Sequence, residues 1–172
     1  SLGRLLAETH EIPVFLYEES SQFPHRHRLE QIRKGGFEQL KTKLLRDDWR
    51  PDYGPQRPHP SAGACVIGAR RPLIAFNVNL ESHNLKIAEE IARRIRASNG
   101  GIPFVKALGL LVSTTKHDGV QISINLTNYQ QTPLAEVITA VFKEASDFSV
   151  AISGTELIGL IPADAVVGAA QN

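Results

Sequence analysis

The stretch PLIAFNVNL at residues 72–80 decides the fold class, because its side chains alternate between apolar and polar. Successive side chains of a β-strand point to opposite faces, so Asn77 and Asn79 share one face and their apolar neighbours share the other. The stretch ISINLT at residues 122–127 repeats the pattern and adds Asn125 to a polar face. We therefore expect a sheet with one apolar face covered by helices and one polar face left bare.

Helix and strand signals alternate along the rest of the chain. The expected elements are strands at 64–70 and 72–80, a helix at 85–98, strands at 104–112 and 120–128, a helix from Pro133, a strand at 151–160 and a short helix at 162–169. From residue 64 onward this order is β-α-β-β-α-β, the ferredoxin-like arrangement of an antiparallel sheet with both helices on one face. The predicted fold class is α/β, as an α+β sandwich, and the strands at 64–70 and 72–80 are expected to form one long or interrupted strand pair.

The residues before this sheet predict a helix-strand-helix extension. A helix reaches about His10, an apolar strand covers residues 12–17, and short helices follow up to about Arg46. The chain opens at Ser1 inside a helical pattern and contains no methionine. We interpret it as a fragment of a longer polypeptide.

The overall composition argues against several classes of partner. The chain has 172 residues, 42% of them hydrophobic, with a formal net charge of +1. Such a charge balance predicts no strong attraction to nucleic acid or to an anionic membrane. No apolar run approaches the roughly 20 residues of a membrane span. Cys65 is the one cysteine, which favours a reducing compartment, and we expect a cytoplasmic protein.

Metal and nucleotide motifs are not recognisable in the sequence. His25 and His27 lie two residues apart without a cysteine or acidic partner at a typical ligand spacing, which favours solvated side chains over a metal site. No glycine-rich phosphate loop occurs, so we expect no nucleotide. Cys65 falls in an expected strand and is interpreted as a small core residue rather than a nucleophile.

The loop at residues 52–63, DYGPQRPHPSAG, differs from an ordinary connection. It combines glycines that let a ligand approach, prolines that restrict the backbone, and Tyr, Arg, His and Ser side chains that can make contacts. A preorganised loop binds with a smaller loss of entropy. The alternative is a structural connector whose prolines turn the chain.

Asparagine is depleted in strands, so the three strand asparagines need a reason. Either Asn77, Asn79 and Asn125 direct their amides at a ligand, or they are hydrogen-bonded side chains on a solvated face.

Several stretches resemble the glutamate formiminotransferase family. They are IPVFLY at 12–17, PDYGP at 51–55, HPSAGA at 59–64, GARRPLIAFNVNL at 68–80, VKALG at 105–109, residues 123–133, and GTELIGLIP at 154–162. The resemblance covers nearly the whole chain in order, and it assigns the chain to the C-terminal subdomain of the formiminotransferase domain. It implies that residues 1–50 are the tail of the N-terminal subdomain with a linker and that residues 51–172 are the C-terminal subdomain.

The family pairs two α/β subdomains whose sheets face a channel that holds folate and an amino-acid donor. The resemblance thus implies a folate site made by a loop and by the polar sheet face. The expected folate-binding residues are Asp52, Tyr53, Gly54, Pro55, Gln56, Arg57, Pro58, His59, Pro60, Ser61, Ala62, Gly63, Asn77, Asn79 and Asn125. Arg70 and Lys106 are candidates for carboxylate contacts, with surface charge as the alternative.

The family's catalytic histidine lies in a His-Pro-Arg motif that this chain does not contain. The resemblance therefore implies no catalytic residue here and no transfer activity for the chain alone. It implies a folate-binding half of a transferase that moves a formimino group from N-formimino-L-glutamate to tetrahydrofolate, in histidine degradation and one-carbon metabolism. The expected partners are folate, formiminoglutamate, the missing part of the N-terminal subdomain and a second copy in a homodimer, with no metal or nucleotide. The alternative is a non-catalytic folate-binding or regulatory module that retains the fold.

Overall fold

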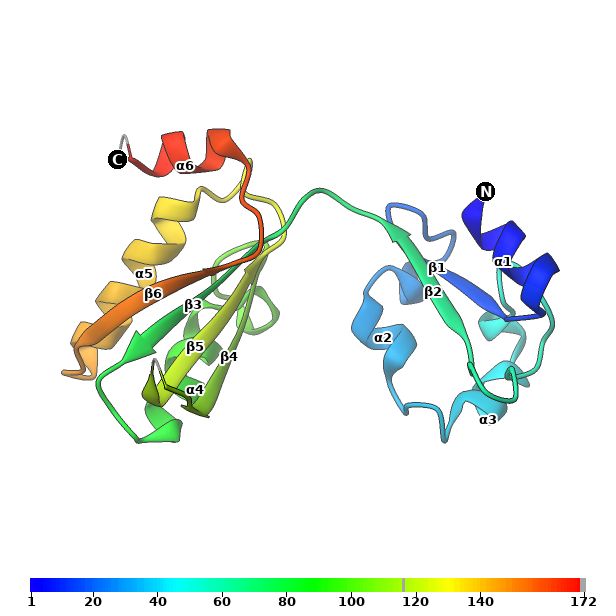
Figure 1. The fold of residues 1–172 in the computed structure, drawn as a ribbon, viewed down its shortest axis with the longest axis horizontal. Helices are drawn as coiled ribbons and strands as arrows, with labels where there is room; N and C mark the ends of the chain where they lie inside the picture. The colour runs from blue at the N-terminus through cyan, green and yellow to red at the C-terminus, as the bar shows by residue number, and fades with distance from the viewer. Residues whose placement is uncertain (116, 171–172) are drawn as a thin grey trace. The chain divides into compact units, whose positions relative to one another are not determined.

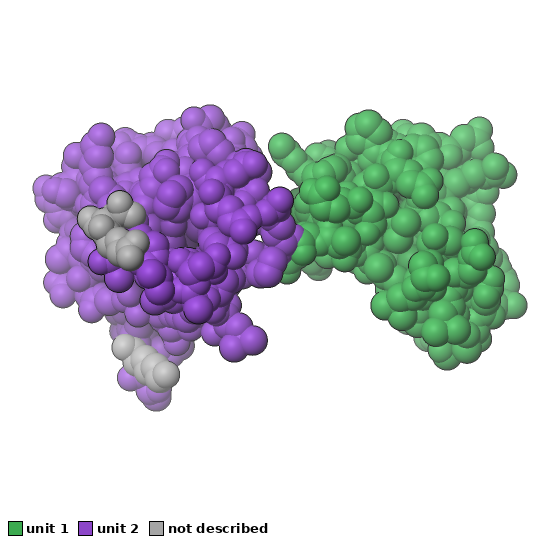
Figure 2. All heavy atoms as spheres, turned by 90° about the horizontal axis from the view of Figure 1, so that it is seen from above, with its two compact units in different colours: residues 1–70 green, residues 71–172 purple. Residues whose placement is uncertain are grey.

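The structure is a computed structural model that describes residues 1–115 and 117–170. It consists of two compact units, Ser1–Arg70 and the residues from Arg71 onward, which Figure 2 colours separately. The domain boundary expected at residue 50 does not coincide with this division. Each unit has its own hydrophobic core and is described by itself.

The first unit is built around two parallel strands. Strand β1 (Val14–Glu18) pairs with β2 (Cys65–Ala69), with Val14 opposite Cys65 and Glu18 opposite Ala69. The helices of this unit are α1 (Leu2–His10), α2 (Leu29–Arg33) and α3 (Leu40–Leu44), with short 3-10 helices at Pro24–Arg26 and Asp47–Trp49. The expected helix-strand-helix order is therefore confirmed.

The expectation that residues 64–70 and 72–80 form one strand pair is wrong. Strand β2 pairs with β1 in the first unit, and residues 70–73 are outside any strand before the next sheet begins. Pro72 has no backbone N–H to donate to a ladder, which favours an interruption there. The β-α-β-β-α-β order is present, but it starts at Ile74 and not at residue 64.

The core of the first unit is small and aromatic. Phe15 of β1, Ile32 of α2, Leu44 of α3 and Trp49 are buried together. The rings of Phe15 and Trp49 meet edge to face with centroids 6.2 Å apart, an arrangement that aromatic quadrupoles favour. The short helices of this unit are thus held by packing on β1 rather than by their own length.

The second unit is the ferredoxin-like sheet (Figure 1). Its elements are β3 (Ile74–Leu80), α4 (Leu85–Ile95), β4 (Val105–Ser113), β5 (Asp118–Leu126), α5 (Leu134–Asp147), β6 (Ile152–Ile158) and α6 (Ala163–Ala170), with a 3-10 helix at Ala97–Asn99. The strand order is β4-β5-β3-β6, and every neighbouring pair is antiparallel. The predicted fold class is confirmed.

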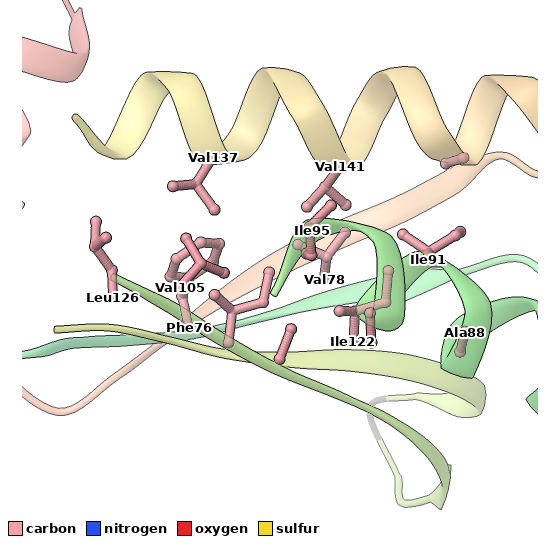
Figure 3. Close-up of a cluster of buried hydrophobic side chains, with 14 of the residues drawn as sticks. Phe76, Val78, Ala88, Ile91, Ile95, Val105, Ile122, Leu126, Val137 and Val141 are labelled. Atoms are coloured by element: carbon pink, nitrogen blue, oxygen red, sulfur yellow. The ribbon is translucent and has the colours of Figure 1, made fainter. Parts of the chain in front are cut away.

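Both long helices bury one face of this sheet. Figure 3 shows Val137 and Val141 of α5 directed toward Phe76 and Val78 of β3, with α4 residues such as Ile91 in the same cluster. The burial of β3 alternates residue by residue, as the sequence pattern predicts. None of the helices among the described residues is long and apolar enough to cross a membrane.

Helix α4 lies directly on strand β4 at Gly109. A Cβ atom at this position would collide with the backbone of Ala88 and Glu89 in α4. Backbone atoms do not move aside as a flexible side chain can, so the glycine sets the distance between the helix and the sheet. The conformation of Gly109 itself is not what requires glycine, since its φ is not positive.

We predict that Gly109→Ala lowers the free energy of unfolding by about 2 kcal/mol, because overpacking a tight core contact typically costs about 1–3 kcal/mol. Gly154→Ala is the matched control: it also lies in a strand, and a Cβ there would meet nothing within 4 Å. Chemical denaturation of both variants measures the difference. Equal stabilities would show that α4 does not rest on β4 at Gly109.

Candidate functional site

The face of the sheet opposite α4 and α5 is called the open face. The register of the strands arranges its side chains in three rows that cross β4, β5, β3 and β6 in that order. The first row is Lys106, Asn125, Ala75 and Ile158; the middle row is Leu108, Ser123, Asn77 and Glu156; the third row is Leu110, Gln121, Asn79 and Gly154. The structure thus brings the three expected asparagines onto one face, each in a different row.

The open face has a polar centre, and its two outer strands carry both apolar and charged side chains, with Lys106 on β4 and Glu156 on β6. The two central strands contribute the amide and hydroxyl side chains, whereas the outer strand β4 contributes Leu108 and Leu110, which are 59% and 41% exposed. Ile158 of β6 is 45% exposed at the other margin. Apart from Lys106 and Ser113, β4 is apolar on both faces, so its pattern shows no alternation from which these leucines could be placed.

Gln121 is a functional candidate that sequence reasoning missed. It lies opposite Asn79 in the register, and its Nε2 donates a hydrogen bond to Asn79 Oδ1 over 2.7 Å. The side chain is only 7% exposed although it belongs to the open face. A signal was available, because Gln121 lies at the same parity in β5 as Asn125.

The loop at residues 52–63 belongs to the first unit, and its first residues form an antiparallel bridge with β1. The N–H of Val14 donates to the Tyr53 carbonyl over 2.9 Å, and the N–H of Asp52 donates to the Val14 carbonyl over 2.9 Å. Further along, Gln56 Nε2 donates to the Leu44 carbonyl over 2.7 Å. The start of the loop is therefore fixed to β1 and α3.

Residues 59–63 form a tight turn that is closed by backbone hydrogen bonds. The N–H of His59 donates to the Gly63 carbonyl over 2.7 Å, and the N–H of Gly63 donates back over 3.0 Å. Inside the turn, the His59 ring nitrogen Nδ1 accepts from the N–H of Ala62 over 3.0 Å. The turn is thus rigid before any ligand arrives.

The fold itself requires glycine at two positions of the loop. Gly54 and Gly63 adopt left-handed φ values of 87° and 67°, which other residues adopt only with strain. A Cβ at Gly54 would lie 2.6 Å from the Ile12 carbonyl oxygen, and one at Gly63 would lie 3.0 Å from the Phe37 ring. The close approach that these glycines permit is therefore to the chain itself.

Asp52 directs its carboxylate inward. Its Oδ2 accepts from the N–H of Leu16 over 2.8 Å and from Arg26 Nη1 over 3.2 Å. The side chains of Arg26 and Asp52 are 1% and 4% exposed. Burial lowers the pKa of the Arg26 guanidinium from its usual value, and the charge of Asp52 acts in the opposite direction.

A hollow of about 320 Å³ adjoins the loop. It is lined by the end of α1, at Thr9, His10 and Glu11, and by residues 57–60. Arg57 Nη2 donates to Glu11 Oε2 over 2.8 Å across this hollow, with both side chains largely exposed. The arrangement offers charged and ring-nitrogen groups to a polar ligand.

The two basic candidates lie in different units. Arg70 follows β2 at the end of the first unit, and Lys106 stands in the first row of the open face beside Asn125; both are exposed. Among residues 1–115 and 117–170, no group of three or more His, Cys, Asp or Glu side chains is placed to hold a metal ion. Cys65 is half-buried in β2.

The fold and the open face define a class: a ferredoxin-like α+β unit with a polar sheet face, joined to a smaller unit with a rigid turn. The family description "Formiminotransferase domain, N-terminal subdomain" matches residues 1–70, and "Formiminotransferase domain" matches residues 75–172. The chain belongs to the formiminotransferase domain family.

Curated relatives of the chain carry the corresponding names. Glutamate formimidoyltransferase of Streptococcus pyogenes serotype M1 is 44% identical over 160 residues, which cover 93% of this chain and 53% of the relative. The protein of the same name from Thermoplasma acidophilum is 42% identical over 99% of this chain and 56% of its own length. Formimidoyltransferase-cyclodeaminase of Dictyostelium discoideum is 37% identical over 98% of this chain and 32% of its own. The chain spans about half the length of the first two relatives.

The assignment of the chain to the C-terminal subdomain alone is corrected by these matches. Both subdomains are represented, and the match to the N-terminal one ends at residue 70. The loop at residues 52–63 accordingly lies in the part that matches the N-terminal subdomain. The reason is β2, which follows the loop and completes the sheet of the first unit by pairing with β1.

We predict that Asp52→Ala destabilises the first unit by about 3–5 kcal/mol, because it leaves the buried Arg26 cation without its partner. Arg57→Ala is the matched control, since it breaks an ion pair whose members are 67% and 73% exposed and should cost at most about 1 kcal/mol. Thermal and chemical unfolding of the two variants measure the losses. A small loss for Asp52→Ala would mean that its carboxylate is not needed by the fold.

Proposed function

We propose that this chain is the folate-binding part of a glutamate formimidoyltransferase, which moves a formimino group from N-formimino-L-glutamate to tetrahydrofolate in histidine degradation and one-carbon metabolism. The observation that carries the proposal is the family match over both units together with relatives named for this activity. In this proposal tetrahydrofolate is the one-carbon acceptor, and no metal or nucleotide takes part.

The proposed transfer needs three things from the protein. The accepting amine of tetrahydrofolate must lose a proton, the tetrahedral intermediate must be stabilised, and the two substrates must be held in line. This chain would supply the third, since correct positioning alone contributes large effective molarities. The proton would be moved by a histidine of a His-Pro-Arg motif elsewhere in the working enzyme, because histidine titrates near neutral pH.

Two surfaces of the chain are proposed to contact folate. The first is the loop at residues 52–63, whose turn at residues 59–63 loses little entropy on binding because its hydrogen bonds are already made. The second is the polar centre of the open face, where Asn77, Asn79 and Asn125 direct amides away from the core. Arg70 and Lys106 would take carboxylates of the substrates.

A non-catalytic folate-binding or regulatory module is the second candidate. One observation favours it: Asp52, Gly54 and Gly63 each have a purely structural reason in this fold, so the loop could persist without catalysis. The two candidates agree on folate binding and differ on turnover.

The amide test addresses folate binding on the open face. Asn77→Thr and Asn125→Thr should weaken the binding of tetrahydrofolate five- to 150-fold, because a lost hydrogen bond to a buried polar group costs about 1–3 kcal/mol. The melting temperature should be unchanged or higher, because threonine suits strands better than asparagine. Calorimetric titration of the whole chain under reducing conditions measures the affinity for tetrahydrofolate, and thermal unfolding measures the melting temperature.

Ser153→Thr is the control for this test, because Ser153 lies in β6 at the register shift between Asn79 and Leu80, where it is opposite no residue of β3 and outside the rows of the open face. It should leave binding unaltered. If both asparagine variants bind as tightly as the parent, the open face is merely solvated.

The activity test separates the two candidate functions. The purified chain should bind tetrahydrofolate but transfer no formimino group, and adding the rest of the transferase should restore turnover. Turnover by the chain alone would refute the proposed division of labour, and failure to gain activity in the assembled protein would favour the non-catalytic module.

A further inference from the structure

In the third row of the open face, the side-chain amide of Asn79 is held by a hydrogen bond, and the neighbouring residue, Gly154, has no side chain. Gln121 donates to Asn79 Oδ1 over 2.7 Å, and Gly154 stands on the other side of Asn79 in the register. We propose that Gln121, Asn79 and Gly154 form a subsite that recognises a hydrogen-bond acceptor of the ligand. The subsite rests on the proposed function for the identity of that ligand, a reduced folate.

The role of Gln121 is to orient Asn79. A side-chain amide has an acceptor and a donor end, and the two ends differ only by a half-turn about the last side-chain bond. The hydrogen bond from Gln121 engages Oδ1, so the NH₂ group of Asn79 is the end that can be directed at a ligand. Gln121 is only 7% exposed, which restricts its own freedom to turn. Gln121 is therefore a positioning residue, and Asn79 is the residue that makes the contact.

The role of Gly154 is to leave room. A Cβ at this position would meet nothing within 4 Å, and its backbone does not have the positive φ that requires glycine. The absence of a side chain is therefore not demanded by the fold. It leaves open the space beside Asn79 on the side away from Gln121, through which a ring can approach the amide edge-on.

The chemistry of the subsite selects what can occupy it. An NH₂ donor with a glycine beside it suits the edge of a flat ring that carries a carbonyl oxygen or an unprotonated ring nitrogen. The pyrimidinone ring of a reduced pterin carries such acceptors. A ligand that offers only donors along that edge would be rejected, because the fixed amide cannot turn without losing its bond to Gln121.

Three variants of the whole chain test the subsite. Gln121→Glu replaces the donor by a carboxylate, so the Asn79 amide must turn its NH₂ group toward residue 121 and present Oδ1 to the ligand. Binding of tetrahydrofolate should fall about 10- to 100-fold. Gln121→Met has a similar length and no hydrogen bond, so Asn79 is free to adopt either orientation and the loss should be only a few-fold. Gly154→Val should abolish binding while the melting temperature stays at or above that of the parent.

Two controls separate orientation from charge and from the proposed function. The affinity of Gln121→Glu is measured at low and at high salt. High salt screens the repulsion between the new carboxylate and an anionic ligand, so the loss that remains there is the effect of the turned amide. In the ligand-free protein, proton exchange of the side-chain amides by NMR should show a protected NH₂ group on Gln121 in the parent and on Asn79 in Gln121→Glu.

The subsite is supported if the parent binds tetrahydrofolate most tightly, Gln121→Met less tightly and Gln121→Glu least tightly, and if the amide exchange follows the pattern described above. The subsite is overturned if Gln121→Met and Gln121→Glu lose affinity equally, or if the loss in Gln121→Glu disappears at high salt. It is also overturned if Gly154→Val binds tetrahydrofolate as tightly as the parent. Failure of the parent chain to bind tetrahydrofolate would overturn the folate proposal, and an unprotected Gln121 amide in the parent would overturn the orientation by Gln121 whatever the ligand is.

Discussion

The register between β3 and β5 is the constraint on which the second unit depends. Ile74 stands opposite Leu126 and Leu80 opposite Val120, with every pair between them in step. Because side chains alternate with a period of two, a slip by one residue would move the asparagines under the helices and the core residues into solvent. Burying two or three amides without partners costs several kcal/mol, since each costs roughly 1–3 kcal/mol. The same pairing that makes the core therefore also sets which amides meet across the open face.

The sheet could be predicted from the sequence because its central strands carry unambiguous alternation. Strand β2 could not, because Cys65–Ala69 is a short apolar run that suits either a parallel pair or an antiparallel neighbour. Its partner β1 lies about fifty residues earlier, and only long-range packing decides between the two possibilities. The interruption at Pro72 was visible, but its meaning as a division between units was not.

The sequence indicated which residues to consider for the candidate site, but not which contacts each of them makes. The asparagines and the turn were found from composition and resemblance, and the structure locates them on an open face and in a hydrogen-bonded turn. What sequence could not supply were the contacts. Asp52 is engaged by Arg26, a partner in a stretch with no strong pattern, and the pairing of Gln121 with Asn79 exists only through the register. Each depends on two segments meeting, which local propensity does not encode.

The acceptor role of the His59 ring has a consequence for the tautomer of that residue. Nδ1 accepts from the N–H of Ala62, so in the neutral ring the hydrogen must reside on Nε2. The turn thereby fixes which ring nitrogen is a donor, because the N–H groups of Ser61 and Ala62 both donate to Nδ1. At the edge of the hollow next to Arg57, the imidazole is supplied as an N–H donor of fixed direction.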